Sequence, residues 1–405
     1  MRPKVLLVTP TCPVPPTAGA PLRTGGWLRA AAGAAELALA TLVRTREEAA
    51  ALRELHGLVQ HVVAVAAHRT APARLCDRVL AAVTGRPLPV VAGASRQLRL
   101  AIERLIADWS PDVIQLEQLA AATYLGLARR SRCAIVYSAH NVESRVVGGP
   151  PHEGSRSTVA YVRRTAALET TVATAADRVV AVTAAEAAWF AARGATAVTI
   201  ANALWLEDLP LRPGISDEDP PTLLFVGHLA YPPNRDAALR LVRDILPRVR
   251  SHHPRVRCVV AGRRPPREVQ RLTRLGAEVV ADPPDLGALW ARASVFVCPL
   301  RWGGGSRLKL IEAAARGVPT ASTRAGVEGL ELRAGEDLAV ADDGAGLAAA
   351  VLELLANPGL ASRRAQSARR RVEAHHDWRQ LTPRVRELYE DLGGRAVHDS
   401  DGGVG

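Results

Sequence analysis

Lysine and aromatic residues are scarce in this chain of 405 residues. Only two of its 52 basic residues are lysines, Lys4 and Lys309, whereas alanine and arginine are abundant. We attribute this bias to GC-rich codon usage, so the number of arginines does not by itself indicate a partner. Aromatic residues make up 4% of the chain, which argues against the stacking surfaces of proteins that bind single-stranded nucleic acid.

Cysteine is also rare, and its pattern argues against two structural devices. The five cysteines are odd in number and form no CxxC pair, which argues against a disulfide framework and against a zinc site. Cys258 and Cys298 lie within apolar runs, where we expect buried free thiols in a reducing compartment. The histidine pairs at 252–253 and 375–376 have no spaced carboxylates beside them. We therefore expect neither a bound metal nor a cofactor.

Long hydrophobic runs are missing as well. No stretch of about 18 apolar residues is free of charge, so we expect no transmembrane helix. The apolar run near the N-terminus, in MRPKVLLVTPTCP, is too short for a signal peptide and is broken by proline. These features predict a cytoplasmic protein. Its formal net charge of +12 favours anionic ligands, nucleic acid or an anionic membrane surface, and composition does not choose among them.

What the chain does have is a regular alternation of short apolar runs and alanine-rich helical stretches. The runs are apolar throughout, as in a parallel sheet that is covered on both faces. Seven lie in the first half and six in the second: 5–9, 37–43, 62–66, 112–117, 134–140, 178–183 and 197–202, then 223–227, 257–262, 277–282, 294–299, 318–323 and 338–342. This pattern predicts an α/β fold with two Rossmann-like, doubly wound domains.

A segment rich in proline and acidic residues, LPLRPGISDEDPPT, separates the two sets of runs. It indicates an interdomain linker. The domains that we expect are an N-terminal one over 1–208, the linker over 209–221, a second domain over 222–375, a C-terminal helix over 376–393 that crosses back to the first domain, and a disordered tail over 394–405. Ligands of such sheets bind beyond the carboxyl ends of the strands, so we expect a site in a cleft between two facing domains.

The segment at 299–323, PLRWGGGSRLKLIEAAARGVPTAST, is the strongest candidate for such a site. Glycines let the backbone approach a ligand, and the amides of a helix start attract anions. The backbone from Gly304 through Gly305, Ser306 and Arg307 to Leu308 would supply these amides. Arg307 and Lys309 would add two cations, and Glu312, one turn further along, suits ribose hydroxyls. The same spacing also occurs in an ordinary surface helix, and the loop is neither GxGxxG nor a Walker loop.

Several blocks in the second half occur in an order and spacing that resemble one enzyme family. They are FVGHLAYPPNRDA at 225–237, VVAGRRPP at 259–266, the segment at 299–323, and GVEGL at 326–330. The agreement continues more loosely through AHNVESR at 139–145 and ADRVVAVTAAE at 176–186. Together they resemble the retaining glycosyltransferases of the GT-B fold, family 4, and most of all a bacterial subgroup with this donor loop.

The resemblance implies a donor and an acceptor on different domains. The second domain would bind a UDP-, GDP- or dTDP-sugar without a metal, and the first would bind an unidentified acceptor, either a polysaccharide or lipid intermediate or a small natural product. The implied donor-binding residues are Glu312 at the ribose, Gly304 to Leu308 at the diphosphate and sugar, Gly227 and Gly262 at strand ends, Arg263 after the second, and Gly19 and Arg23 near the phosphates. His140 would lie near the transferred sugar.

Two departures from the family pattern bear on the donor site. Gly304 stands where many relatives have a first glutamate, so only Glu312 remains of that pair. Asn234 and Arg235 lie where many relatives have a lysine. We therefore expect Lys309, together with Arg307, to supply the positive charge for the donor phosphates. With no convincing carboxylate nucleophile in the sequence, the resemblance implies same-face attack, in which a donor phosphate oxygen helps to deprotonate the acceptor.

The function that we expect is a retaining glycosyltransferase with His140, Arg307 and Lys309 as its catalytic residues. A sugar-nucleotide epimerase of the same architecture is one alternative, and it would convert the donor without an acceptor. A basic nucleic-acid-binding protein is a weaker alternative, because the arginines form no recognisable binding motif. The arginine cluster at 362–376 is typical of a solvated helix face. With a lipid acceptor, it would also suit a peripheral contact with the inner face of an anionic membrane.

Overall fold

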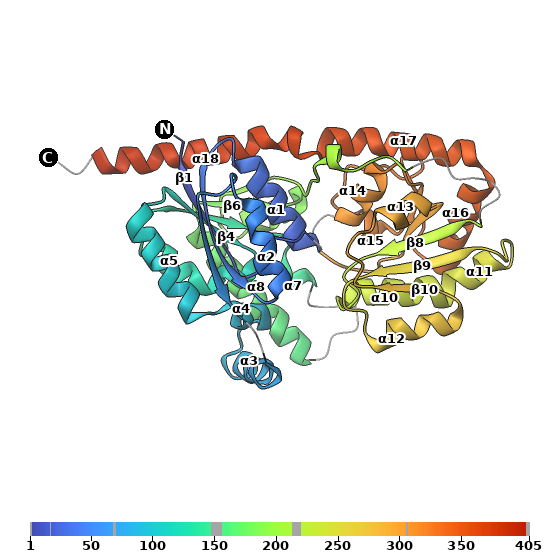
Figure 1. Cartoon of the computed structure of the whole chain (residues 1–405), viewed down its shortest axis with the longest axis horizontal. Coiled ribbons are helices and arrows are strands. Elements are labelled where there is room, and N and C mark those ends of the chain that lie inside the picture. The colour runs from blue at the N-terminus through green and yellow to red at the C-terminus, as the bar shows by residue number, and fades with distance from the viewer. Residues whose placement is uncertain are drawn as a thin grey trace. The chain divides into compact units, whose positions relative to one another are not determined.

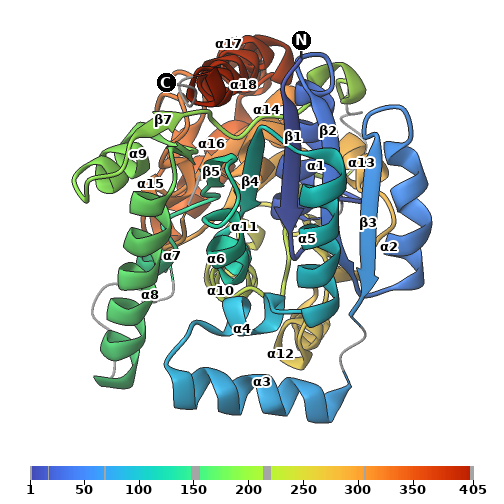
Figure 2. The same ribbon diagram turned by 90° about the vertical axis from the view of Figure 1, so that its left-hand side faces the viewer.

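The computed structural model describes residues 2–16, 18–67, 70–146, 156–212, 220–304 and 307–401. The chain divides into two compact units, Met1–Ala201 with Leu381–Gly405, and Asn202–Gln380. The sequence analysis placed the corresponding boundaries after residues 208 and 375. Each unit is a parallel sheet flanked by helices (Figures 1 and 2).

The first unit contains a seven-stranded sheet in the order β3-β2-β1-β4-β5-β6-β7. All its strand pairs are parallel. The strands are β1 Lys4–Thr9, β2 Glu36–Val43, β3 His61–Ala66, β4 Val113–Glu117, β5 Ala134–Ser138, β6 Arg178–Ala181 and β7 Ala197–Thr199. Because β1, β2 and β4 are covered on both faces, nearly every residue in them is buried.

Helices surround this sheet, and local sequence explains where several of them begin. Thr45 starts α2 with a capping box to Glu48, and Ser95 caps α5, which buries Leu98, Ile102 and Leu105 at helical spacing. The helices are α1 Gly19–Ala31, α2 Arg46–Ala51, α3 Ala71–Thr84, α4 Leu88–Gly93, α5 Arg96–Trp109, α6 Leu125–Ala128, α7 Glu143–Val146, α8 Arg156–Ala175 and α9 Ala184–Ala191, with 3-10 turns at Leu52–Leu55 and Leu119–Tyr124.

The C-terminal helix α18, Trp378–Asp401, belongs to the first unit from Leu381 onward. It returns to this unit after the second unit is complete, and Tyr389 is buried there. From the sequence we expect a disordered tail from residue 394. In the structure α18 instead continues to Asp401; residues 402–405 lie outside the described part of the chain.

The second unit contains a six-stranded parallel sheet in the order β10-β9-β8-β11-β12-β13. The strands are β8 Thr222–Val226, β9 Arg257–Gly262, β10 Glu278–Ala281, β11 Val295–Cys298, β12 Thr320–Ser322 and β13 Ala339–Val340. The helices are α10 Pro232–Arg240, α11 Leu246–Arg250, α12 Arg267–Gln270, α13 Gly287–Arg292, α14 Leu308–Ala315, α15 Arg324–Val327, α16 Gly344–Ala356 and α17 Pro358–His375. A π-helical turn at Leu241–Ile245 and 3-10 turns at Leu206–Asp208 and Arg271–Leu275 complete the unit.

Both sheets reverse their strand order at one place, and this determines where a ligand can bind. In the first unit the chain proceeds outward from β1 to β3 on one side and from β4 to β7 on the other. In the second unit the same reversal separates β8 from β11. Ligands of doubly wound sheets bind beyond the carboxyl ends of the strands at such a reversal. The segments of interest therefore follow β1 and β4 in one unit, and β8 and β11 in the other.

Candidate functional site

In the second unit, two glycines lie at the carboxyl ends of neighbouring strands. Gly227 follows β8 and Gly262 ends β9, with a φ of +148°. A Cβ on Gly262 would lie only 1.7 Å from the carbonyl oxygen of Gly227. A Cβ on Gly227 would lie 2.9 Å from both the Asn234 Nδ2 and the Lys309 Nζ. Glycine is thus required at position 262, whereas at position 227 it leaves room for the ends of these two side chains.

Lys309 lies in the first turn of α14, and its ammonium extends to the end of β8. Its Nζ donates to the Asn234 Oδ1 at 2.5 Å and lies 4.6 Å from the ring centroid of Phe225. Lys309 forms no ion pair with a carboxylate anywhere in the described ranges of the chain. Burial, with a smaller effect of the Arg307 charge, lowers the pKa of Lys309 to about 8. A ligand anion would supply the missing counter-charge.

Asn234 lies in the first turn of α10 and is buried. Its Nδ2 donates to the carbonyl oxygen of His228 at 3.1 Å, which turns Oδ1 toward Lys309. The next residue, Arg235, is exposed. Burial and the charges of Arg264 and Arg263 lower the pKa of His228. Arg263 and Arg264 thus add positive charge beside this corner of the unit, although Asp282 opposes their effect on His228.

Arg307 precedes α14 and holds the backbone of the preceding loop. Its Nη1 donates to the carbonyl oxygen of Gly304 at 2.5 Å, and its Nη2 donates to that of Ala325 at 3.1 Å. The side chain is buried. Two of its donors thus bind carbonyl groups of the protein, which indicates that Arg307 holds this loop in place. The phosphate contact expected from the sequence would be an additional role. Gly305 and Ser306 lie outside the described residues.

The start of α14 adds further donors for an anion. Leu308 is its first residue, and the first amides of a helix have no acceptor within that helix. Together with the helix dipole they form an anion site. One turn further, the Glu312 Oε1 accepts from the Arg316 Nε at 3.1 Å. Burial raises the pKa of Glu312, although Arg316 opposes this shift.

Two arginines, Arg301 and Arg240, hold the loop after β11 in place. Their contacts were not expected from the sequence. Arg301 binds Asp236 of α10 in bidentate fashion, at 2.9 and 2.5 Å. Arg240 of α10 donates to the carbonyl oxygens of Pro299, at 3.4 Å, and Asp342, at 2.5 Å. The element that carries Asn234 is thereby joined to the loop that leads to Lys309. The sequence carries no periodic signal for these contacts, because they join separate elements.

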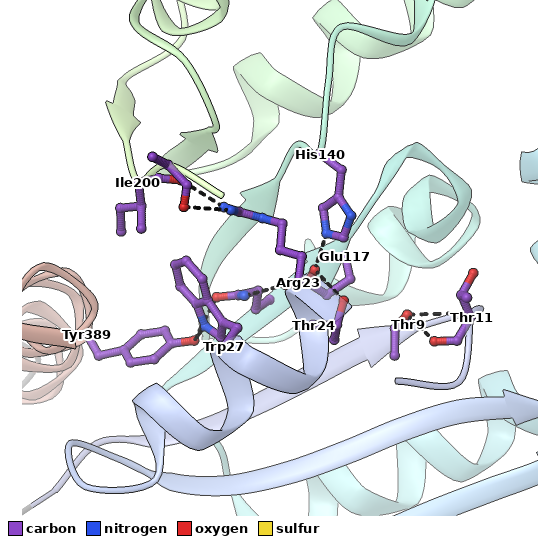
Figure 3. Close-up of polar contacts among 11 residues, drawn as sticks. Thr9, Thr11, Arg23, Thr24, Trp27, Glu117, His140, Ile200 and Tyr389 are labelled. Atoms are coloured by element: carbon purple, nitrogen blue, oxygen red, sulfur yellow. Dashed lines mark hydrogen bonds and ion pairs between the residues drawn. The ribbon is translucent and has the colours of Figure 1, made fainter. Parts of the chain in front are cut away.

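The first unit has a buried polar network at its own strand reversal (Figure 3). Glu117 ends β4 and is 1% exposed. Its Oε2 lies 2.7 Å from the Nε2 of His140, which follows β5, and accepts from the Thr24 Oγ1 at 3.2 Å. Its Oε1 accepts from the Gln115 Nε2 at 2.5 Å. The sequence prediction singled out His140 but missed its carboxylate partner.

The electrostatics of this pair favour a neutral histidine beside an ionised glutamate. Burial lowers the pKa of His140, and Arg23 lowers it further, against an opposing effect of Glu117. Burial raises the pKa of Glu117, but the contacts with His140 and Gln115 outweigh it, so that this pKa lies below its ordinary value. A neutral His140 donates to Glu117 through Nε2–H. Its Nδ1 is then a hydrogen-bond acceptor.

Arg23 is buried inside the first unit rather than on its surface. Its Nη2 donates to the carbonyl oxygen of Ile200 at 3.0 Å and its Nη1 to that of Ala201 at 3.1 Å. Burial lowers its pKa to about 10. Arg23 therefore ties α1 to the segment after β7. Gly19 is the exposed first residue of α1, so its position agrees with a helix start near the end of β1.

A hydrogen-bond chain connects α18 to Glu117. The Trp27 Nε1 donates to the Tyr389 Oη at 2.7 Å, and the Tyr389 Oη donates to the Gln115 Oε1 at 2.8 Å (Figure 3). Gln115 then donates to Glu117. The available sequence signal was the pair of polar residues at alternate positions of VIQLE, an otherwise apolar buried strand.

Comparisons with known proteins agree with these two units. Residues 43–204 match the family described as Glycosyltransferase Family 4, and residues 220–357 match Glycosyl transferases group 1. The chain has a TM-score of 0.71 to sucrose-phosphate synthase from Thermosynechococcus elongatus, with 17% identity, over 97% of this chain and 100% of that one. Each unit therefore matches a glycosyltransferase domain family, and the structural neighbours show the GT-B fold.

Two further relatives extend this result. The chain has a TM-score of 0.66 to Anabaena HepE in complex with UDP-glucose, with 15% identity, over 96% of this chain and 100% of that one. It is also 32% identical over 182 residues to a glycogen synthase of Mycobacterium tuberculosis. That match covers 42% of this chain, and the chain spans 42% of the length of these curated relatives.

The predicted site residues thus form two groups, one in each unit. Gly227, Gly262, Asn234, Lys309 and the start of α14 come together at the strand reversal of the second unit. His140 lies at the first unit's reversal, where Arg23 contributes to its electrostatics. Arg263 directly follows β9, and Arg235 lies in α10, the helix that follows β8.

A small cavity in the first unit lies between α4, the turn after β4 and the helices α7 and α8. It has a volume of about 40 Å³, and its lining includes Gln118, Glu143, Tyr161 and Thr165. Burial, with the neighbouring Glu169 charge, raises the pKa of Glu143 to about 7. A cavity of this size holds a few water molecules. It has too little room for a sugar.

Proposed function

We propose that the chain transfers a sugar from a nucleoside-diphosphate sugar to an acceptor, with retention of configuration at the anomeric carbon. The observation that carries the proposal is the partly buried ammonium of Lys309 beside Gly227, at the start of α14. It lacks a carboxylate partner among the described residues and lies where a doubly wound sheet binds its ligand. A diphosphate carries the negative charge that would pair with this ammonium.

The chemistry of the proposed reaction places charge where these groups lie. As the bond to the sugar breaks, the nucleoside diphosphate gains negative charge. Lys309 and the first amides of α14 would stabilise that charge, because they are fixed in place before the reaction. Arg307 would contribute by holding the loop, since two of its donors bind Gly304 and Ala325. The attack we propose is on the same face as the leaving group, with a phosphate oxygen accepting the proton.

His140 has a separate role in this proposal. Its Nδ1 is an acceptor when Nε2–H donates to Glu117, so it suits a hydrogen bond from a sugar hydroxyl. We assign Glu312 to the nucleotide ribose, with Arg316 positioning its carboxylate. HepE binds UDP-glucose, which makes UDP the first nucleotide to test. The acceptor class is left open among a polysaccharide intermediate, a lipid intermediate and a small natural product.

The test is thermal unfolding of the full chain with UDP, GDP, dTDP, CDP and ADP, with and without EDTA. A ligand at 100 times its Kd stabilises the folded protein by about 2.7 kcal/mol. We expect one nucleotide to raise the Tm, and EDTA to leave that shift unchanged. No shift with any nucleotide would contradict the donor site, and loss of the shift in EDTA would contradict metal-independent binding. With the matching sugar nucleotide, proton NMR of the product's anomeric centre then tests retention.

A further inference from the structure

Helix α3 of the first unit turns its apolar side chains to solvent. Leu75, Val79, Leu80 and Val83 are 62%, 55%, 51% and 80% exposed, and no residue of the helix is buried. The three partly covered positions, Ala73, Asp77 and Ala81, recur every four residues and mark the inner face. Single exposed apolar residues are ordinary, but four on one helix face mark an interaction surface.

Helix α3 has a regular cap at each end, although it buries no apolar side chain. The Thr70 Oγ1 caps it by accepting from the amide of Ala73 at 3.4 Å, and Pro72 lies in its first turn. Gly85 ends it in the left-handed conformation, with a φ of +66°. Figure 2 shows α3 lying beyond α4 at one end of the first unit. The outer face of α3 is therefore both well formed and accessible within this unit.

Positive charge borders the exposed face. Between Glu54 and Glu103 the chain has six arginines and a single acidic residue, Asp77, which faces inward. Arg74 and Arg78 lie on α3 itself, and neither forms an ion pair with a carboxylate in the part of the chain that the structure describes. The Arg164 guanidinium lies at the C-terminal end of α3, since a Cβ on Gly85 would be 2.8 Å from its Nη1.

The arginine-rich helix α17 offers no comparable surface. Three of its arginines bind carboxylates: Arg364 lies 2.8 Å from Glu353, Arg369 lies 2.7 Å from Glu373, and Arg371 lies 2.7 Å from Asp337. Its inner face, which includes Val372, is buried. Among the described residues no single helix is long and apolar enough to cross a membrane; α16 and α17 pass that test only as a pair, with a bend of 106° between them.

We propose that α3 is an interfacial helix that binds an anionic membrane surface. Leu75, Val79 and Val83 would enter the headgroup region, while Arg74 and Arg78 would bind lipid phosphates from the border of the apolar face. The positive charge of Arg74 and Arg78 favours a membrane over a second copy of the chain. A second copy of the chain docked through α3 would bring the same arginines together, and their mutual repulsion would oppose pairing. A phospholipid surface supplies the anions that these arginines lack.

The test is sedimentation of the full chain with vesicles of phosphatidylcholine alone or mixed with phosphatidylglycerol. We expect binding only to the mixed vesicles, and weaker binding as salt rises. Arg74→Gln with Arg78→Gln should lower the partition coefficient about 30-fold, from the loss of about 1 kcal/mol for each arginine. Leu75→Ser with Val79→Ser should also lower it. These side chains are exposed, so we expect the Tm to remain unchanged.

Matched controls separate this helix from other surfaces. Arg363→Gln with Arg370→Gln, on α17, and Leu275→Ser, a leucine with 49% exposure elsewhere, should leave vesicle binding unchanged. Failure to bind mixed vesicles, or equal loss in the α17 variant, would overturn the proposal. The proposal would also be overturned if the wild type were an oligomer in solution and the serine variant had a lower mass, because α3 would then be a protein interface. Nucleotide-induced stabilisation should persist in every α3 variant, so this test is independent of the donor site.

Discussion

Replacing Lys309 with methionine should change stability and ligand affinity in opposite directions. Methionine has a similar length but no charge. In the unliganded protein, the pKa of Lys309 falls from 10.5 to about 8. At neutral pH this shift corresponds to a cost of about 3 kcal/mol at most for keeping the ammonium in its site. The Asn234 Oδ1 would lose its donor, a loss of about 1 kcal/mol. We expect the unliganded variant to be more stable by about 1–2 kcal/mol.

The same substitution should weaken diphosphate binding. A hydrogen bond to a charged group is worth about 1.5–3 kcal/mol, which corresponds to roughly 10- to 150-fold in Kd. A nucleoside without phosphates should bind the variant as it binds the wild type. Isothermal titration calorimetry with the nucleotide that stabilises the protein, and with its nucleoside, measures both affinities. Urea denaturation measures the free energy of unfolding.

The control is Arg292→Met, which removes an exposed cation at the end of α13. We expect it to change neither the nucleotide affinity nor the free energy of unfolding appreciably. Equal loss of affinity for the nucleotide and the nucleoside, or no loss for either, would remove Lys309 from the phosphate site. A less stable unliganded variant would refute the inference that the ammonium is held at a cost.

Three further predictions follow from named contacts. Nucleoside diphosphate affinity should fall as pH rises through about 8, because the ammonium of Lys309 then loses its proton. Between pH 8 and 10.5 the free energy of unfolding of the unliganded protein should increase, since only the unfolded chain keeps that proton in this range. Gly262→Ala should destabilise the second unit by more than about 3 kcal/mol in urea denaturation, since its Cβ would meet the carbonyl oxygen of Gly227 at 1.7 Å; an unaffected midpoint would contradict this. Glu117→Gln should lower the pKa of His140 further, because Glu117 raises it; proton NMR titration of the His140 ring measures this, and an unchanged or higher pKa would contradict the pairing.

The sequence predicted the two sheets well because of one property. A strand covered on both faces is apolar at most of its positions, and each of the thirteen runs corresponds to a strand of the structure. The loop before Lys309 was also recognisable, since glycines followed by a helix start are contiguous in sequence. Cys258 and Cys298 are free and buried, as their apolar surroundings predicted.

What the sequence could not reveal depends on side chains that meet from distant positions. Arg307 and Arg23 were expected near phosphates, and their contacts with backbone carbonyls follow only from the tertiary fold. The hydrogen bond of Tyr389 to Gln115 spans 274 positions. Long guanidinium and phenol side chains can reach many partners, so neither spacing nor periodicity selects one.

The hydrogen-bond chain from α18 to Glu117 has a consequence for the order in which the protein is made. The ribosome synthesises β1 to β7 first and then the entire second unit, and only afterwards Tyr389. Until that residue emerges, the Gln115 Oε1 lacks the donor that it has in the finished fold. The surroundings of His140 are therefore completed last. A nascent or cleaved chain that ends before α18 would carry every residue of the nucleotide-binding corner while its histidine still lacked this support.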